Sequence, residues 1–288
     1  MRLLATADLH YNHPKSRRLA DDLIDHIKAA APDAVLLVGD TAASVGDDLE
    51  RCLARFDDLQ AAKLFVPGNH ELWTHGDDSH RLFIDELPRR VRGAGWQWLQ
   101  TDPFVTPSLA IIGNVGWYDY SFAPPHLGIP LRFYEHKISP GAASFFAEHR
   151  HLLGQDDDIP PHAREIYARW NDGRFAKLHR SDSQFLTELI AQLTWQLESL
   201  RHIPHVLVAT HHLPFREMLP PSNAAQWQFV RAFLGSEQFG QTLLQYPNVK
   251  TLICGHSHLP LDTHVHHIHA INIGSGYRTK THRILDLG

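Results

Sequence analysis

The amino-acid sequence predicts an α/β layered fold, because two patterns alternate over its first hundred residues. Two segments, 16–30 and 46–60, carry apolar residues at helical spacing with charged residues opposite them. Short, near-continuous apolar runs lie around these segments, as expected of strands buried on both faces: RLLATA (2–7), AVLLVGD (34–40) and KLFVPGN (63–69). This β-α-β-α-β order is typical of helices packed against a largely parallel sheet.

The rest of the chain predicts further strands and one long interruption. A helix is expected over 181–200, which opens on Ser or Asp caps. Residues 119–182 are rich in Pro, His, Asp and aromatic residues, so we expect a partly helical insertion or cap there, with a solvated acidic loop at 155–161. No repeat or low-complexity linker divides the chain, so a single domain over 1–288 is predicted. The further strands are expected at 96–99, 104–106, 109–117, 205–211, 249–256 and 268–276.

Composition narrows the classes of function. The chain has 288 residues, of which 43% are hydrophobic, enough for a substantial core. Its formal net charge of −5 gives no field that would hold a nucleic-acid backbone or an anionic membrane, so a nucleic-acid partner is not expected. The two cysteines, Cys52 and Cys254, are too few for a disulfide framework. With no signal-peptide pattern and no long apolar run, a cytoplasmic location without a membrane span is predicted.

Polar side chains able to bind a metal follow five of the predicted strands. Because ligands gather outside the carboxyl ends of strands in open α/β sheets, these residues are expected to meet. Asp8 and His10 are two apart and lie on one side if the chain stays extended. Imidazole, carboxylate and amide groups favour Mn, Fe, Zn or Co, and seven or more donors fit two ions that share a carboxylate. The strand-end residues are Asp8, His10, Asp40, Asn69, His70, His211, His212, His256 and His258.

The ordered series D-x-H, GD, GNHE, H and GHxH resembles the calcineurin-like metallophosphoesterase superfamily, over residues 8 to 258. The resemblance implies a four-layer α/β/β/α sandwich, in which two mixed sheets are flanked by helices. It also implies two divalent or trivalent transition-metal ions, with Asp40 bridging them and His70 as the catalytic histidine beside them. By the same resemblance Asp8, His10 and His258 hold one ion, and Asn69, His211 and His256 hold the other.

Two positions depart from the family pattern. Many members carry Asp or Asn at the position of Ala43 in GDTAA, so a supporting hydrogen bond from that side chain is absent or comes from Ser44. The doublet of His211 and His212 leaves two candidates for one ligand. His211 is the expected ligand, because it falls where the strand-ending histidine of the family falls.

The resemblance implies a metal-dependent phosphatase or phosphodiesterase. A metal-activated hydroxide would attack phosphorus in a phosphate monoester or diester, while His70 assists the leaving group or the phosphoryl oxygens. A small or nucleotide-like substrate is expected, and no protein partner. The aromatic residues at the start of the insertion would either line the cleft or pack in the core: Trp117, Tyr118, Tyr120, Phe122, Phe133 and Tyr134.

Two alternatives stay open from the sequence. One is a non-catalytic protein-binding scaffold with the same fold, although such adaptors tend to lose metal ligands or the catalytic histidine. The other is a nuclease, which would usually bring a DNA-binding region and more positive charge.

Overall fold

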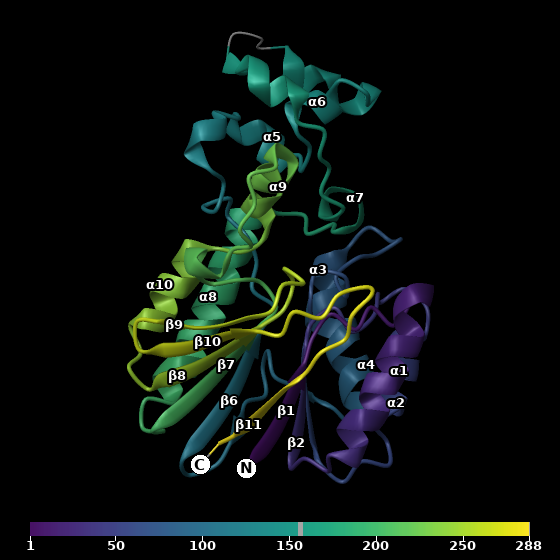
Figure 1. The fold of residues 1–288 in the computed structure, drawn as a ribbon, viewed down its shortest axis with the longest axis vertical. Coiled ribbons are helices and arrows are strands. Elements are labelled where there is room, and N and C mark those ends of the chain that lie inside the picture. The colour runs from purple at the N-terminus through teal and green to yellow at the C-terminus, as the bar shows by residue number, and fades with distance from the viewer. Residues whose placement is uncertain (155–157, 288) are drawn as a thin grey trace.

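Two β-sheets pack face to face in the computed structural model, and helices cover their outer faces (Figure 1). The structure describes residues 1–154 and 158–287, so residues 155–157 of the predicted acidic loop lie outside the described part. The four layers and the mixed sheets confirm the predicted sandwich.

The first sheet has the strand order β11-β1-β2-β3-β4. Its strands run parallel except for β11, which pairs antiparallel with β1. The outer face of this sheet is covered by α1 (Pro14–Ala29), α2 (Asp48–Ala54) and α4 (Leu87–Gly93) (Figure 1). The strands are β1 (Arg2–Thr6), β2 (Ala34–Val38), β3 (Ala62–Val66), β4 (Gln97–Trp98) and β11 (Arg283–Asp286).

The second sheet has the order β5-β6-β7-β8-β10-β9, with antiparallel strands at its two edges and parallel strands between them. Helices α8 (Asp182–Ser199) and α10 (Glu237–Leu244) cover its outer face (Figure 1). The strands are β5 (Phe104–Val105), β6 (Leu109–Asn114), β7 (His205–Thr210), β8 (Val249–Cys254), β9 (Leu261–Val265) and β10 (Ile268–Asn272).

Alternate residues of the central strands serve two different cores. In β2, Leu36 and Val38 pack between the sheets, whereas Val35 and Leu37 pack under the helices. Both faces of the strand are therefore buried, which is why its sequence reads as continuously apolar rather than alternating. This packing keeps the carboxyl ends of strands from both sheets at one end of the sandwich.

The segment between β6 and α8 rises above that end of the sandwich (Figure 1). Its described helices are all short, so the partly helical character that the sequence predicts takes the form of one- or two-turn pieces. They include α5 (Leu131–Glu135), α6 (Pro140–Ala143) and α7 (Asp172–Phe175), with 3-10 turns at Pro125–Leu127, Ala147–Leu153 and Pro161–Glu165. The single-domain boundary at 1–288 stays a prediction.

Besides α10, β9 and β11, two helical parts of the fold were not expected from the sequence. Residues Ser79–Arg81 (α3) and Leu82–Glu86, a π-helical turn, lead directly into α4 and form one continuous helical segment. A further helix, α9 (Ala225–Val230), lies beneath the insertion (Figure 1). Within the described ranges, every helix is too short or too polar to cross a membrane.

Candidate metal centre

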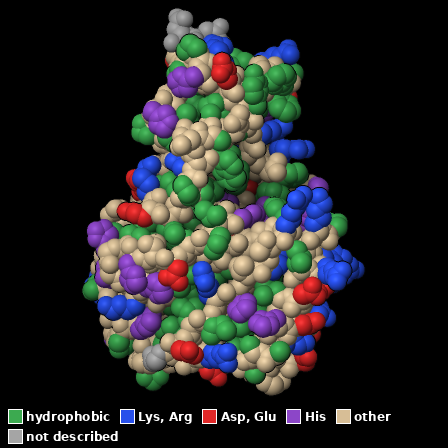
Figure 2. All heavy atoms as spheres, in the orientation of Figure 1, with side chains coloured by type: hydrophobic (Ala, Val, Ile, Leu, Met, Phe, Trp, Pro, Cys, Tyr) green, Lys and Arg blue, Asp and Glu red, His purple; other side chains and the backbone are tan. Residues whose placement is uncertain are grey.

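All seven predicted ligands meet where the carboxyl ends of strands from both sheets come together. Their side chains come from the loops after β1, β2, β3, β7 and β8, and each of these residues is buried except His258, which is partly exposed. Figure 2 shows histidine side chains in the hollow between the insertion and the sandwich. The structure therefore brings together residues that are up to 250 positions apart in the sequence.

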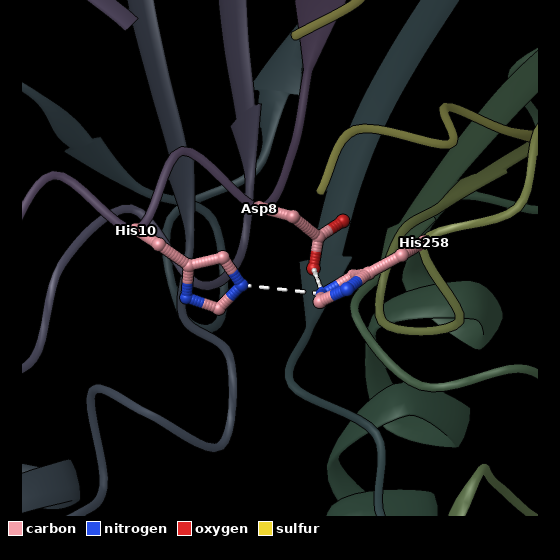
Figure 3. A group of neighbouring side chains, drawn as sticks. All are labelled: Asp8, His10 and His258. Carbon is pink, nitrogen blue, oxygen red and sulfur yellow. Dashed lines mark hydrogen bonds and ion pairs between the residues drawn. The ribbon is translucent and has the colours of Figure 1, made fainter. Parts of the chain in front are cut away.

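One group consists of Asp8, His10 and His258 (Figure 3). The Nε2 atoms of His10 and His258 face each other at 3.2 Å, and Asp8 Oδ1 lies 3.3 Å from His258 Nε2. Two imidazole nitrogens and a carboxylate oxygen pointing at one place form a donor set that suits a transition-metal ion.

A second group is built around His211. Its Nε2 lies 3.2 Å from Asn69 Oδ1 and 3.1 Å from His256 Nδ1. The same atom lies 3.4 Å from Asp40 Oδ1. Two histidines, an amide oxygen and a carboxylate fit the same class of metal as the first group.

Asp40 lies between the two groups. Its Oδ2 is 3.8 Å from His10 Nε2 and 3.7 Å from His70 Nε2, while its Oδ1 faces His211. A single carboxylate thus contacts histidines on both sides, which is the geometry needed for a shared ligand.

Hydrogen bonds fix the orientation of two histidine rings, through the ring nitrogen that faces away from the centre. His211 Nδ1 donates to the carbonyl of Val38 at 3.1 Å, and His256 Nε2 donates to the carbonyl of Phe233 at 3.2 Å. Such bonds select the tautomer that leaves the other nitrogen free to bind a metal. His212 instead bonds the carbonyl of Val115 through Nδ1, at 3.0 Å, so the ring that faces Asp40 is that of His211.

Burial and neighbouring charged groups shift the pKa values of the side chains in this centre. Burial lowers the pKa of His10 and His256 well below the usual value, which keeps these rings neutral. Burial also opposes the charged form of His211, but Asp40 raises the pKa of His211 to about 9. The pKa of Asp40 is well below its usual range, because the histidines around it outweigh the effect of its burial.

Five of the seven predicted ligands have left-handed backbone conformations. The φ angles are 52° at Asp8, 44° at His10, 50° at Asp40, 67° at His256 and 57° at His258. Such conformations are rare outside glycine and cluster at functional sites. Asp8 and His10 therefore do not lie on one side of an extended chain as expected: β1 ends at Thr6, and a left-handed loop turns both side chains inward.

The glycines of the motifs leave room for the ligands. A Cβ on Gly68 would lie 2.3 Å from Asp40 Oδ1, and a Cβ on Gly255 would lie 2.5 Å from Asp8 Oδ2. Both distances are shorter than any real contact of this kind, so a larger residue at either position would displace a carboxylate.

Glu71 holds the loops after β2 and β3 together, next to the position of Ala43. Its buried carboxylate accepts hydrogen bonds from the backbone N–H groups of Asp40 (3.0 Å), Ala42 (3.0 Å) and Gly68 (2.7 Å). Ser44, the expected substitute, bonds the carbonyl of Trp73 instead, at 2.8 Å. The last residue of GNHE was not predicted to have this function, although the motif itself contains it.

A cleft of about 240 Å³ opens above the centre. His70 lies in its wall, with its side chain 15% exposed. Insertion residues Arg169, Trp170 and Asn171 also line it, so the insertion does contribute to the cleft. The aromatic side chains in its wall are Trp73, Trp170, Trp227 and Tyr277.

For the aromatic residues at the start of the insertion, the structure confirms the second of the two expectations, packing in the core. Trp117, Tyr118, Phe122 and Phe133 are at most 1% exposed, and they pack in the core beneath the insertion. Tyr134 is buried with them and Tyr120 partly so, hence packing is the function of the whole set.

Comparisons with known proteins agree with this geometry. The family model described as calcineurin-like phosphoesterase matches residues 1–260. The [acyl-carrier-protein] phosphodiesterase PptH of Mycobacterium tuberculosis is 23% identical over 96% of this chain and 78% of its own length.

Solved structures show the same fold. The crystal structure described as phosphopantetheinyl hydrolase (PptH) from Mycobacterium tuberculosis superimposes with a TM-score of 0.65 at 21% identity, covering 96% of this chain and 89% of that one. A dimetal phosphatase from Danio rerio superimposes with a TM-score of 0.51 at 16% identity, covering 96% and 88%.

The family match spans most of the chain, and the ligand groups lie where such a centre needs them. The chain belongs to the calcineurin-like phosphoesterases and is a metal-dependent phosphoric ester hydrolase.

Proposed function

We propose that this chain hydrolyses a phosphodiester at a centre of two metal ions bridged by Asp40. Asp8, His10 and His258 would hold one ion, and Asn69, His211 and His256 the other. The observation that supports this most directly is the position of Asp40, within 4 Å of histidine nitrogens from both groups. Nitrogen and oxygen donors without thiolates favour Mn, Fe, Zn or Co in both positions.

Ions bound there would lower the pKa of water and neutralise charge on the phosphoryl oxygens. Protein side chains would supply the proton or hydrogen bond that the reaction also needs. His70 faces the cleft beside Asp40, and burial lowers the pKa of its ring, so its neutral form prevails at pH 7. Its Nε2–H can donate a hydrogen bond to the leaving oxygen or to a phosphoryl oxygen as negative charge develops there.

The walls of the cleft favour a substrate with an extended arm beyond the phosphorus. Three indole rings supply apolar and stacking surface, from Trp73, Trp170 and Trp227. Arg169 also lines the cleft, with its side chain 27% exposed, and its guanidinium lies 4.5 Å from the centre of the Phe146 ring. A half-buried guanidinium at this place suits an anionic or carbonyl group on the arm of the substrate.

The relative in Mycobacterium tuberculosis supplies a specific candidate. Its name describes a phosphodiesterase acting on acyl carrier protein, and its alignment with this chain covers the insertion as well as the sandwich. We propose the phosphodiester between a phosphopantetheinyl group and a carrier protein as the substrate. This differs from the expectation of no protein partner, because the group would be presented by a protein.

Reporter substrates test the reaction class. With Mn, Co, Zn or Fe added to metal-free protein, bis(p-nitrophenyl) phosphate should be cleaved faster than p-nitrophenyl phosphate. No cleavage of either ester with any metal would contradict the proposed reaction.

Holo acyl carrier protein tests the substrate. Mass spectrometry should show conversion of the holo form to the apo form, and Arg169→Ala should raise KM for this substrate while leaving cleavage of the reporter diester near that of the wild type. Arg174→Ala is the matched control, because Arg174 is an exposed arginine of the same segment outside the cleft. Intact holo protein after prolonged incubation would rule this substrate out.

We also propose a cytoplasmic location. Both cysteines are buried as free thiols, which suits a reducing compartment. Cell fractionation tests this directly, and recovery of the protein outside the cytoplasm would contradict it.

A further inference from the structure

Asp172 is a buried carboxylate of the insertion that contacts the metal centre from above. It is fully buried at the start of α7. Four side chains donate hydrogen bonds to it: Asn69 Nδ2 at 2.9 Å, Trp73 Nε1 at 2.6 Å, Trp170 Nε1 at 2.7 Å and the Tyr118 hydroxyl at 3.0 Å. Each carboxylate oxygen accepts two of these bonds, so the charge is compensated without a cation.

The bond to Asn69 determines which way its amide faces. Because Nδ2 donates to Asp172, Oδ1 is turned toward His211 Nε2, at 3.2 Å. An amide binds a metal through its oxygen, so the opposite orientation would present an NH₂ group to the ion.

Two further bonds fix the walls of the cleft. The indole of Trp73, held through Nε1, stacks on the His70 ring with centres 3.6 Å apart. The indole of Trp170 meets the His256 ring edge to face, with centres 5.7 Å apart. One carboxylate therefore orients a proposed ligand and the rings beside two other functional histidines.

Backbone bonds tie this part of the insertion to the loop that carries the centre. The N–H of Thr74 donates to the carbonyl of Phe175 at 3.0 Å, and the N–H of Ser79 donates to the carbonyl of Lys177 at 2.9 Å. The position of Asp172 is thus set by the same loop that contains Asn69 and His70.

We propose that Asp172 is a positioning residue, which holds the Asn69 amide in the orientation that binds a metal and keeps Trp73 against His70. The inference rests on the proposed function, since it takes Asn69 as a ligand. Loss of a residue that orients a metal ligand typically costs about 10- to 100-fold in metal affinity or activity.

The test compares two buried carboxylates of the insertion region. Asp182 also accepts a tryptophan indole and a tyrosine hydroxyl, from Trp117 (2.7 Å) and Tyr120, and in addition Lys137 Nζ (2.6 Å). It contacts no proposed ligand, so Asp182→Asn controls for the general cost of altering such a carboxylate.

Mn²⁺ titration of the metal-free proteins by calorimetry gives the readout. Asp172→Asn should bind one of two ions about 10- to 100-fold more weakly than the wild type. Asp182→Asn should keep the Mn²⁺ affinity of the wild type, even if the melting temperatures of both variants fall by similar amounts. Wild-type Mn²⁺ affinity in Asp172→Asn would overturn the proposal. Where Asp172→Asn does not fold, Asp172→Glu serves the same comparison, because it moves the carboxylate by one methylene group.

Further variants separate this inference from the proposed function. Asn69→Ala should weaken the binding of the same ion. Unchanged Mn²⁺ binding in that variant would show that Asn69 is not a ligand, and this would contradict the proposed centre itself. The double variant N69D/D172N exchanges the two groups and restores a donor opposite an acceptor. Because a carboxylate is itself a stronger Mn²⁺ ligand than an amide, the comparison is with Asn69→Asp alone: D172N should cost less Mn²⁺ affinity in that background than in the wild type, and an equal cost in both would count against positioning.

Discussion

The imidazole of His70 lies flat against the indole of Trp73, with ring centres 3.6 Å apart and planes inclined by 25°. The backbone N–H of His70 also donates to Asp40 Oδ1 at 2.9 Å. Ring and backbone of this residue are therefore both held relative to the Asp40 carboxylate, as a group acting on a substrate at this place requires.

His70→Ala should lower kcat by about 10² to 10⁴ while both metal ions are retained, since the ring assists the reaction without being a proposed ligand. Steady-state kinetics and metal analysis of the same sample check this. His75→Ala is the control, because His75 is an exposed histidine of the same loop outside the cleft. Full turnover in His70→Ala would remove the residue from the reaction.

Metal removal should abolish turnover and lower the melting temperature. Ions that bind only the folded chain stabilise it by about 2.7 kcal/mol when their free concentration is a hundred times Kd. Dialysis against EDTA followed by calorimetry measures the loss, and addition of Mn²⁺ or Co²⁺ should reverse it. A chelated sample that keeps its activity would contradict a metal-dependent reaction.

Gly255→Ala should impair metal binding without preventing folding. The added Cβ would lie 2.5 Å from Asp8 Oδ2, and overpacking of this kind costs about 1–3 kcal/mol. Gly93→Ala is the matched control, because a Cβ there meets no atom within 4 Å. Metal content per chain distinguishes the two variants. Equal content would show that the loop after β8 shifts enough to accommodate the Cβ without moving Asp8.

The Glu50–Arg90 pair should contribute a stability that depends on pH. Arg90 donates to both oxygens of Glu50 and to the carbonyls of Ser44 (2.6 Å) and Gly46 (2.9 Å), so it holds the loop after Asp40. The hydrogen bonds from Arg90 lower the pKa of Glu50 below its usual 4.5. A carboxylate whose pKa is lower in the folded than in the unfolded state stabilises the folded state at pH values above the unfolded-state pKa. This stabilisation is lost as the pH falls through the folded-state pKa.

Glu50→Gln should therefore cost about 0.2–1 kcal/mol at neutral pH, since the pair is partly exposed. The gap between wild type and variant should close at pH values below 4.5. Urea unfolding at a series of pH values measures it. A gap of the same size at every pH would show that the charge of Glu50 contributes nothing.

The central strands and the ligands that were predictable share one property: each belongs to a continuous apolar strand or follows directly after it. Leu36 and Val35 are both buried, on opposite faces, so β2 stands out in the sequence, and Asp40 follows it. Strand β11 was not predicted because half of its four residues are exposed, and it pairs at the edge of its sheet.

The parts that escaped prediction depend on contacts between distant segments. Asp172 stands in a short helix with no periodic pattern, and its importance comes from side chains 99 and 103 positions away. Likewise, buried Trp117 and cleft-lining Trp170 are the same residue type in the same region, and only the packing of the insertion separates them.

The left-handed backbone at Asp8, His10, Asp40, His256 and His258 bears on how these residues can be studied. An alanine scan would change two things at once there, because alanine lacks both the donor atom and the tolerance of this conformation that Asn, Asp and His possess. Asparagine is tolerated in this conformation, so asparagine replacements would keep the shape of the loop and change only the ligand group: the histidines lose their imidazole, and the aspartates lose their charge but keep one amide oxygen.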